Sequence, residues 1–172
     1  MMKLLHEIKD KELPPDESKL KIREASRAIL FDDNDLIPIL FVSKYNCHKI
    51  PGGGVKNGED KSKALIREIL EEVGSEIEIT NEIGKIIEFR SKWNWKQTSY
   101  CYTGKIKSKN PPTFTEEELN QNFKLIWLTL DEAISKVKND QPTNYAGLFI
   151  QKRDLVFLKK VAKMKKEHKL GI

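Results

Sequence analysis

Three glutamates that follow a glycine-rich run are the residues of this sequence best suited to do chemistry. Glu68, Glu71 and Glu72 lie in the segment Gly53–Ser75, which reads GGVKNGEDKSKALIREILEEVGS. On a helix with about 100° per residue, their carboxylates group on one side, around the small side chain of Ala64. Like charges at this spacing repel one another, so the grouping predicts a cation that neutralises them.

The chemistry of this cluster favours a hard divalent cation. Carboxylate oxygens suit Mg²⁺ or Mn²⁺, whereas zinc prefers nitrogen and sulfur ligands. Mg²⁺ commonly keeps several waters and is shared with substrate phosphates. The glycines ahead of the helix let backbone groups approach such a metal or phosphate closely. The cluster therefore indicates metal-assisted attack of water on a phosphate chain; an ordinary amphipathic helix with an acidic solvent face is the simpler alternative.

A helix over residues 60–73 is expected to carry these glutamates. Asp60 is a suitable N-cap, and Gly74 lies where a left-handed residue ends a helix. The opposite side of this helix is expected to form an apolar core stripe of Leu65, Ile66, Ile69, Leu70 and Val73.

The surrounding pattern predicts an α/β fold, with a mixed sheet and helices packed on it. Residues 21–31 and 36–43 flank an aspartate-rich turn and are expected to pair as a β-hairpin. Further extended runs are expected at 76–80, 83–91, 97–107 and 123–128, and helices at about 131–138 and 147–170.

Length and charge favour one compact unit. The chain has 172 residues and a net charge of +5, which favours an N-terminal arm over 1–20 and a single domain over 21–172. Residues 151–172 carry +6 and the remainder −1. This asymmetry is typical of a docked terminal helix with a solvated lysine face, so a nucleic-acid partner is not expected.

The composition also bears on the compartment. The longest nearly apolar stretch is far shorter than the roughly 20 residues of a membrane helix. The first residues lack the apolar core of a secretory signal, and two cysteines make no disulfide framework. We expect a cytoplasmic protein without a membrane partner, as a monomer or homodimer.

The glutamate segment resembles the Nudix box. That box is a glycine, five residues, Glu, seven residues, then Arg-Glu-aliphatic-x-Glu-Glu-x-Gly-aliphatic. Gly53, Glu59 and the run Arg67–Gly74 match each fixed position, and Ser75 departs at the last one. The resemblance implies a Nudix α/β/α sandwich with a catalytic helix and a C-terminal helix. It also implies hydrolysis of a diphosphate linked to another group, with Mg²⁺ or Mn²⁺.

The resemblance also implies roles for the box residues. Glu68, Glu71 and Glu72 would supply carboxylates to the metal, with Glu68 as an alternative base for the attacking water. Arg67 would orient these acids within the catalytic group, and the carbonyl of Gly53 would be a further ligand. Members often take another acidic ligand from a loop beyond the box, for which the sequence offers Glu118.

Contacts to the substrate are harder to place. Lys44 follows a strand, and Arg23 and Arg27 share one side of the strand before it. These three and Glu59 are candidate substrate-binding residues; surface ion pairs, and a helix-start acid for Glu59, are the alternatives. Aromatic side chains that could stack a nucleobase are Trp93, Trp95, Tyr100 and Tyr102.

The resulting hypothesis is a pyrophosphohydrolase of a nucleoside diphosphate linked to a further group. Nucleoside triphosphates, including oxidised ones, are the first candidates because the chain is short. Dinucleoside polyphosphates, nucleotide sugars and ADP-ribose remain alternatives. A non-catalytic Nudix module that binds a nucleotide or RNA is the alternative from a different class, although such modules usually lose box carboxylates that this chain keeps.

Overall fold

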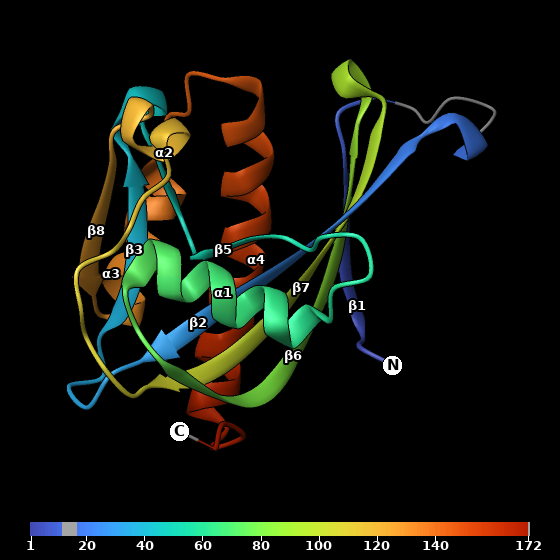
Figure 1. Ribbon diagram of the computed structural model, residues 1–172. Coiled ribbons are helices and arrows are strands. Elements are labelled where there is room, and N and C mark those ends of the chain that lie inside the picture. The colour runs from blue at the N-terminus through green and yellow to red at the C-terminus, as the bar shows by residue number, and fades with distance from the viewer. Residues whose placement is uncertain (12–16, 172) are drawn as a thin grey trace.

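The computed structural model describes residues 1–11 and 17–171, which form two β-sheets with helices on both sides (Figure 1). The larger sheet is mixed, because β1–β6 and β2–β7 pair in parallel and β6–β7 and β2–β5 antiparallel. Its strand order is β1-β6-β7-β2-β5, with bounds β1 Leu4–Lys9, β2 Lys21–Phe31, β5 Gly52–Gly54, β6 Ile77–Arg90 and β7 Trp95–Ile106. The predicted mixed α/β architecture is confirmed.

The smaller sheet is antiparallel and corrects the predicted hairpin. It consists of β4 (Cys47–Lys49), β3 (Ile37–Val42) and β8 (Phe123–Leu128). The expected pairing of 21–31 with 36–43 is wrong, because β2 and β3 lie in different sheets. β7 pairs with β2 along one edge and β5 with Ala25–Arg27 on the other, whereas β3 pairs with β4 and β8. The chain therefore crosses between sheets at the aspartate-rich turn.

Three of the four α-helices begin and end near the predicted residues, whereas α2 forms where a loop was expected. They are α1 (Lys61–Val73), α2 (Glu116–Asn120), α3 (Leu130–Asn139) and α4 (Tyr145–Lys166). Short 3-10 turns occur at Glu17–Lys19, Ser43–Tyr45 and Ser91–Trp93. Within the described parts of the chain, no helix has the length and apolar character needed to cross a membrane.

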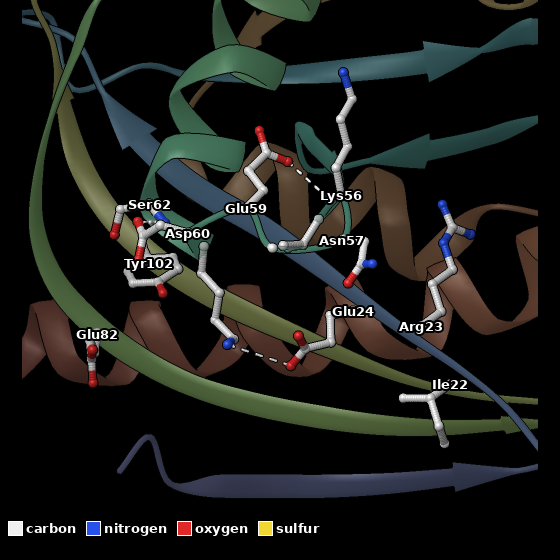
Figure 2. Close-up of a pocket in the computed structure, with 13 residues that line it drawn as sticks. Ile22, Arg23, Glu24, Lys56, Asn57, Glu59, Asp60, Ser62, Glu82 and Tyr102 are labelled. Carbon is white, nitrogen blue, oxygen red and sulfur yellow. Dashed lines mark hydrogen bonds and ion pairs between the residues drawn. The ribbon is translucent and has the colours of Figure 1, made fainter.

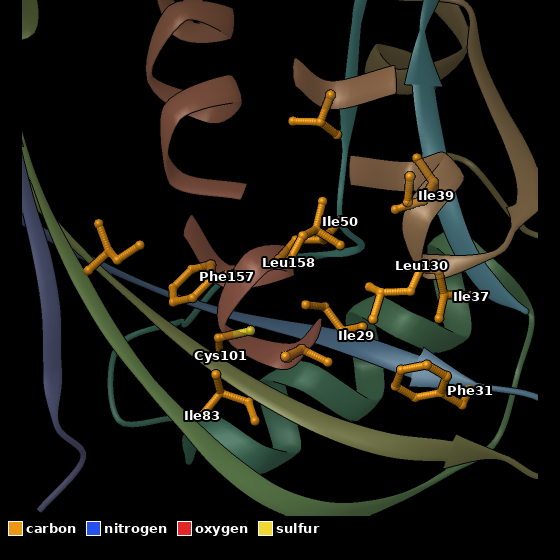
Figure 3. Packing of buried hydrophobic residues seen from close by; sticks show 14 of the residues in the cluster. Ile29, Phe31, Ile37, Ile39, Ile50, Ile83, Cys101, Leu130, Phe157 and Leu158 are labelled. Atoms are coloured by element: carbon orange, nitrogen blue, oxygen red, sulfur yellow. The ribbon is translucent and has the colours of Figure 1, made fainter. Parts of the chain in front are cut away.

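The larger sheet is covered on both faces, and this places the core. Ile29 and Phe31 of β2 pack with Phe157 and Leu158 of α4, together with α3 and the smaller sheet (Figure 3). Alternate β2 residues point the other way and pack under α1, in a second cluster with Leu65, Ile69 and Val73. The α/β/α sandwich expected from the sequence therefore has α1 on one side of the sheet and α4 on the other (Figure 1).

The buried side of α1 differs from the expected apolar stripe. Leu65, Ile69 and Val73 are buried, but Ile66 is 47% exposed and Leu70 is 53% exposed. Glu72 is buried in their place, at 1% exposure. A buried carboxylate is unfavourable unless it has partners, so the helix orientation must be explained by what Glu72 contacts.

We predict that Gly74→Ala destabilises the fold more than Gly58→Ala. Both glycines have positive φ, 69° and 75°, so alanine pays about 1 kcal/mol of backbone strain at each. A Cβ on Gly74 would also lie 2.1 Å from the carbonyl oxygen of Asn110, whereas one on Gly58 meets nothing within 4 Å. Denaturant unfolding of both variants measures the difference in the free energy of unfolding. Equal losses of this free energy would contradict the steric argument.

Candidate active site

Two carboxylates of α1 converge on the backbone of Gly52 and Gly53. The Gly52 N–H donates to Glu72 Oε2 at 2.7 Å. A Cβ built on Gly53 would lie 2.2 Å from Glu68 Oε2 and 2.6 Å from Glu68 Oε1. A side chain at residue 53 would therefore displace the Glu68 carboxylate, so glycine is required for this approach.

Arg67 holds the site together from the other side of Glu68. Its Nε and Nη2 donate to the two carboxylate oxygens of Glu59, both at 3.0 Å, and its Nη1 donates to Glu68 Oε1 at 2.6 Å. Nη2 also reaches the carbonyl of Gly54 at 3.1 Å. The bidentate pairing with Glu59 fixes the guanidinium. Its single hydrogen bond to Glu68 then orients that carboxylate toward the glycine loop.

Glu59 is engaged by this arginine. Hydrogen bonds from Arg67, together with one from the Lys56 N–H, lower the pKa of Glu59 to about 2. The structure therefore uses both Glu59 oxygens to fix Arg67 and the loop. We expected Glu59 among the substrate contacts, and its observed partners all belong to the box loop and α1.

Glu72 has a basic partner that the sequence did not reveal. Burial raises the pKa of its carboxyl, and the nearby Lys49 ammonium and Gly52 N–H act against that rise. Lys49 Nζ lies 2.9 Å from Glu72 Oε1, and both side chains are largely buried. Lys49 ends β4, two residues before Pro51, and nothing in its sequence neighbourhood distinguishes it from a surface lysine.

A buried network of charges anchors the glycine loop to α4. Asp154 Oδ2 accepts the Ile50 N–H at 2.9 Å, and Asp154 Oδ1 accepts from Arg153 Nε at 2.7 Å. Arg153 Nη1 lies 3.6 Å from Glu88 Oε2 of β6. All three charged side chains are 0% exposed. Water cannot solvate these charges, so each is stabilised by the others.

Two arginines are buried behind the glycine loop. Arg153 belongs to the basic terminal segment, but it lies in the core. Arg27 was expected to reach substrate, yet it is 7% exposed and its Nη1 donates to the Gly52 carbonyl at 2.5 Å. Burial lowers the pKa of Arg27 to about 10. In this structure both guanidiniums support the glycine loop from behind.

The box glutamates offer carboxylate oxygens, the ligand type that a hard cation prefers, although two of them contact basic side chains. Glu68 and Glu72 face the glycine cradle, and Glu71 lies half-buried on the same helix. Across residues 1–11 and 17–171, no three His, Cys, Asp or Glu side chains are arranged as a metal cluster. Mg²⁺ and Mn²⁺ prefer carboxylate ligands of this kind, but Arg67 and Lys49 lie beside two of these carboxylates.

Three further predicted site residues have other contacts in the structure. Glu118 forms a capping box at the start of α2, where its carboxylate accepts the Thr115 N–H at 2.7 Å. Gly53 pairs with Ser26 in the sheet, and Lys44 is exposed with its ammonium over Tyr45. Roles for Glu118, for the Gly53 carbonyl and for Lys44 stay predictions.

The four candidate aromatic residues divide between two faces of the sheet. Trp93 and Trp95 lie 5.0 Å apart, and Trp93 also contacts Tyr145 at the start of α4. Tyr100 and Tyr102 pack on the α1 side instead. Strand alternation separates Trp95 from both tyrosines. Arg23 links the tryptophans to the box, because its guanidinium lies over Trp95 and beside Gly54.

A cavity of about 960 Å³ opens beside the box loop. Figure 2 shows Glu59, Asn57 and Lys56 on one wall and Arg23 and Glu24 of β2 on another. Tyr102 and the first turn of α1 complete it. The cavity carries both signs of charge and adjoins the loop on the α1 side, away from the Lys49–Glu72 pair.

Comparison with known proteins gives one family and one fold. The model of the NUDIX domain matches residues 21–148, whereas curated protein sequences gave no match. A NUDIX hydrolase from Nitrosomonas europaea superposes with a TM-score of 0.60 at 15% identity, over 84% of this chain and 91% of that one. A MutT NUDIX hydrolase from Burkholderia pseudomallei superposes with a TM-score of 0.54 at 20% identity, over 77% of this chain and 98% of that one. The E. coli ORF135 protein superposes with a TM-score of 0.57 at 16% identity, over 86% of this chain and 94% of that one.

We predict that Asp154→Asn destabilises the protein by about 3–5 kcal/mol. Asparagine can still accept the Ile50 N–H, but it leaves the buried Arg153 charge with one less anion. Urea unfolding measures the loss. Glu167→Gln is the control, because it removes an exposed partner of Lys163 and Lys169 and should change little. Equal stability of Asp154→Asn and the parent would contradict the anchoring role.

Proposed function

The chain belongs to the NUDIX family of hydrolases, and from this premise we propose that it is a metal-dependent pyrophosphohydrolase of nucleoside diphosphate derivatives. The observation that carries the proposal is the convergence of Glu68 and Glu72 on the side-chain-free backbone of Gly52 and Gly53. Charged carboxylates turned toward the interior are unfavourable for stability alone. Arg67 and Lys49 pair with these two carboxylates, and a divalent cation bound with a phosphate chain at the glycine loop would be a further partner.

The box residues would divide the work of the reaction. Glu68, Glu71 and Glu72 would hold Mg²⁺ or Mn²⁺, which when bound would polarise the phosphate and lower the pKa of the attacking water. Arg67 keeps the Glu68 carboxylate directed at Gly53. Glu68 would accept the water proton as the new oxygen–phosphorus bond forms. The bond from that phosphorus to the bridging oxygen breaks, and the two phosphate-bearing halves leave.

Arg23 gives the substrate a direction across the site. Its guanidinium lies near Gly54 at one end and over the Trp95 ring, 5.4 Å from its centre, at the other. A phosphate chain at the glycine loop would therefore place the attached group toward Trp95 and Trp93. Both rings are half-buried, so a flat nucleobase has a surface on which to stack.

Nucleoside triphosphates, including oxidised ones, are the substrates we favour. Dinucleoside polyphosphates, nucleotide sugars and ADP-ribose are the alternatives that a substrate screen with Mg²⁺ and Mn²⁺ would separate. A binding module without catalysis is the less favoured function, because each carboxylate of the box is kept. The terminal helix α4 packs into the core through its apolar residues and leaves Lys152, Lys159 and Lys163 exposed, which is typical of a docked helix with a solvated lysine face.

We predict that Glu71→Gln lowers Mg²⁺-dependent hydrolysis by at least about 100-fold and leaves the fold intact. Glu71 is half-buried and its side chain is outside both core clusters, so the substitution removes a charge without opening a cavity. Chromatographic measurement of the products from a panel of nucleotides gives the rate, and circular dichroism checks the fold.

Glu76→Gln is the matched control for Glu71→Gln. Glu76 is exposed and follows the box, so the same change in net charge there should leave turnover at the parent level. Full activity of Glu71→Gln would overturn the assignment of the box glutamates to catalysis.

We predict that Gly53→Ala lowers hydrolysis by at least about tenfold, whereas Gly54→Ala has little effect. A methyl group at residue 53 would displace the Glu68 carboxylate, while one at residue 54 lies 3.5 Å from Arg23, an ordinary contact. Neither glycine has a positive φ, so alanine strains neither backbone. Turnover and unfolding measurements on both variants make the comparison; equal turnover would show that the cradle does not position Glu68.

A further inference from the structure

Lys49 occupies the place of a cation at Glu72. One Glu72 oxygen accepts the Gly52 N–H, and the other accepts from Lys49 Nζ at 2.9 Å. The Glu72 side chain is 2% exposed and that of Lys49 is 13% exposed. The carboxylate that a metal would need is therefore already paired inside the protein.

The surroundings of Lys49 hold its ammonium in this place. Lys49 pairs with Leu40 at the end of β4, and its ammonium lies 4.8 Å from the ring centre of Phe123 on β8. A lysine on an exposed surface exchanges freely with water, but this one is confined between a carboxylate and an aromatic face. Such a desolvated pair is lost only if another charge replaces it.

We propose that Lys49 is a built-in counter-cation of Glu72, which a divalent ion must displace before Glu72 can bind it. The inference rests on the proposed metal-dependent function and adds a regulation of the same site. At low metal concentration it leaves two of the three box glutamates paired with basic side chains, because Arg67 pairs with Glu68 and Lys49 with Glu72. When a metal binds, the Lys49 ammonium at Glu72 is replaced by a divalent cation.

The exchange has two physical consequences. The metal-free protein keeps a paired Glu72, so its fold does not depend on the ion. Binding is also weaker than the carboxylates alone would give, because the ion competes with an ammonium already at hydrogen-bond distance. Lys49 thereby sets the metal concentration at which the site becomes active.

Competitive labelling of the parent protein tests the exchange directly. Lysines are acetylated with a small anhydride reagent in EDTA and in saturating Mn²⁺, and the extent at each lysine is read by mass spectrometry. Displacement of Lys49 by Mn²⁺ predicts that its labelling rises at least severalfold. Lys124, which is exposed on neighbouring β8, should label equally in both conditions.

A separate Mn²⁺ titration, followed by electron paramagnetic resonance, distinguishes the two ways to fail. Bound Mn²⁺ with unchanged or reduced Lys49 labelling overturns the inference and leaves the proposed function standing. Absence of Mn²⁺ binding overturns both.

The variant Lys49→Met provides an independent measurement. With the competing ammonium removed, Mn²⁺ should bind on the order of tenfold tighter, and Mn²⁺ should raise the melting temperature more than it does for the parent. Lys124→Met has the same change in net charge and should bind Mn²⁺ like the parent. Equal Mn²⁺ affinity of Lys49→Met and the parent would refute competition. If Lys49→Met does not fold, labelling of the parent decides.

Discussion

The hydrogen bond from the Ile50 N–H to Asp154 is the interaction on which the site depends. It ties the strand that leads into the glycine loop to α4, on the far side of the larger sheet from α1. Asp154 and Arg153 are buried together, and Arg153 extends the contact to Glu88 of β6. Because buried charges are strongly destabilising without partners, each side chain fixes the others, and the loop is held where α1 can meet it.

The second constraint is the orientation of α1. A surface helix normally turns apolar residues inward and charged residues outward, but α1 leaves Ile66 and Leu70 exposed and buries Glu72. The Gly52 N–H and the Lys49 ammonium donate hydrogen bonds to this carboxylate. Arg67 donates to Glu68, which lies close to the backbone of Gly53. The helix is thus oriented by polar partners as much as by its apolar side, which is typical of elements that serve a site.

Local signals in the sequence predicted the elements well. Asp60 accepts the N–H groups of Ser62 and Lys63 at the start of α1, and Gly74 ends it with φ 69°. The strand at 123–128 has its predicted bounds. Pairing was less predictable: the hairpin of 21–31 with 36–43 does not form, because 37–42 pairs with β4 and β8 in the smaller sheet instead. Strand partners depend on long-range contacts that a turn signal does not report.

The family could be recognised from the sequence, because the box is a fixed spacing along one loop and one helix. The same spacing predicts which groups react. Tertiary structure decided which charges face one another. Arg153 stands among lysines in the terminal segment, yet it is buried, and Lys49 is one lysine among many until β4 brings it 2.9 Å from Glu72. Contacts of this kind join residues far apart in the chain, and burial gives them their strength by excluding the water that would screen them.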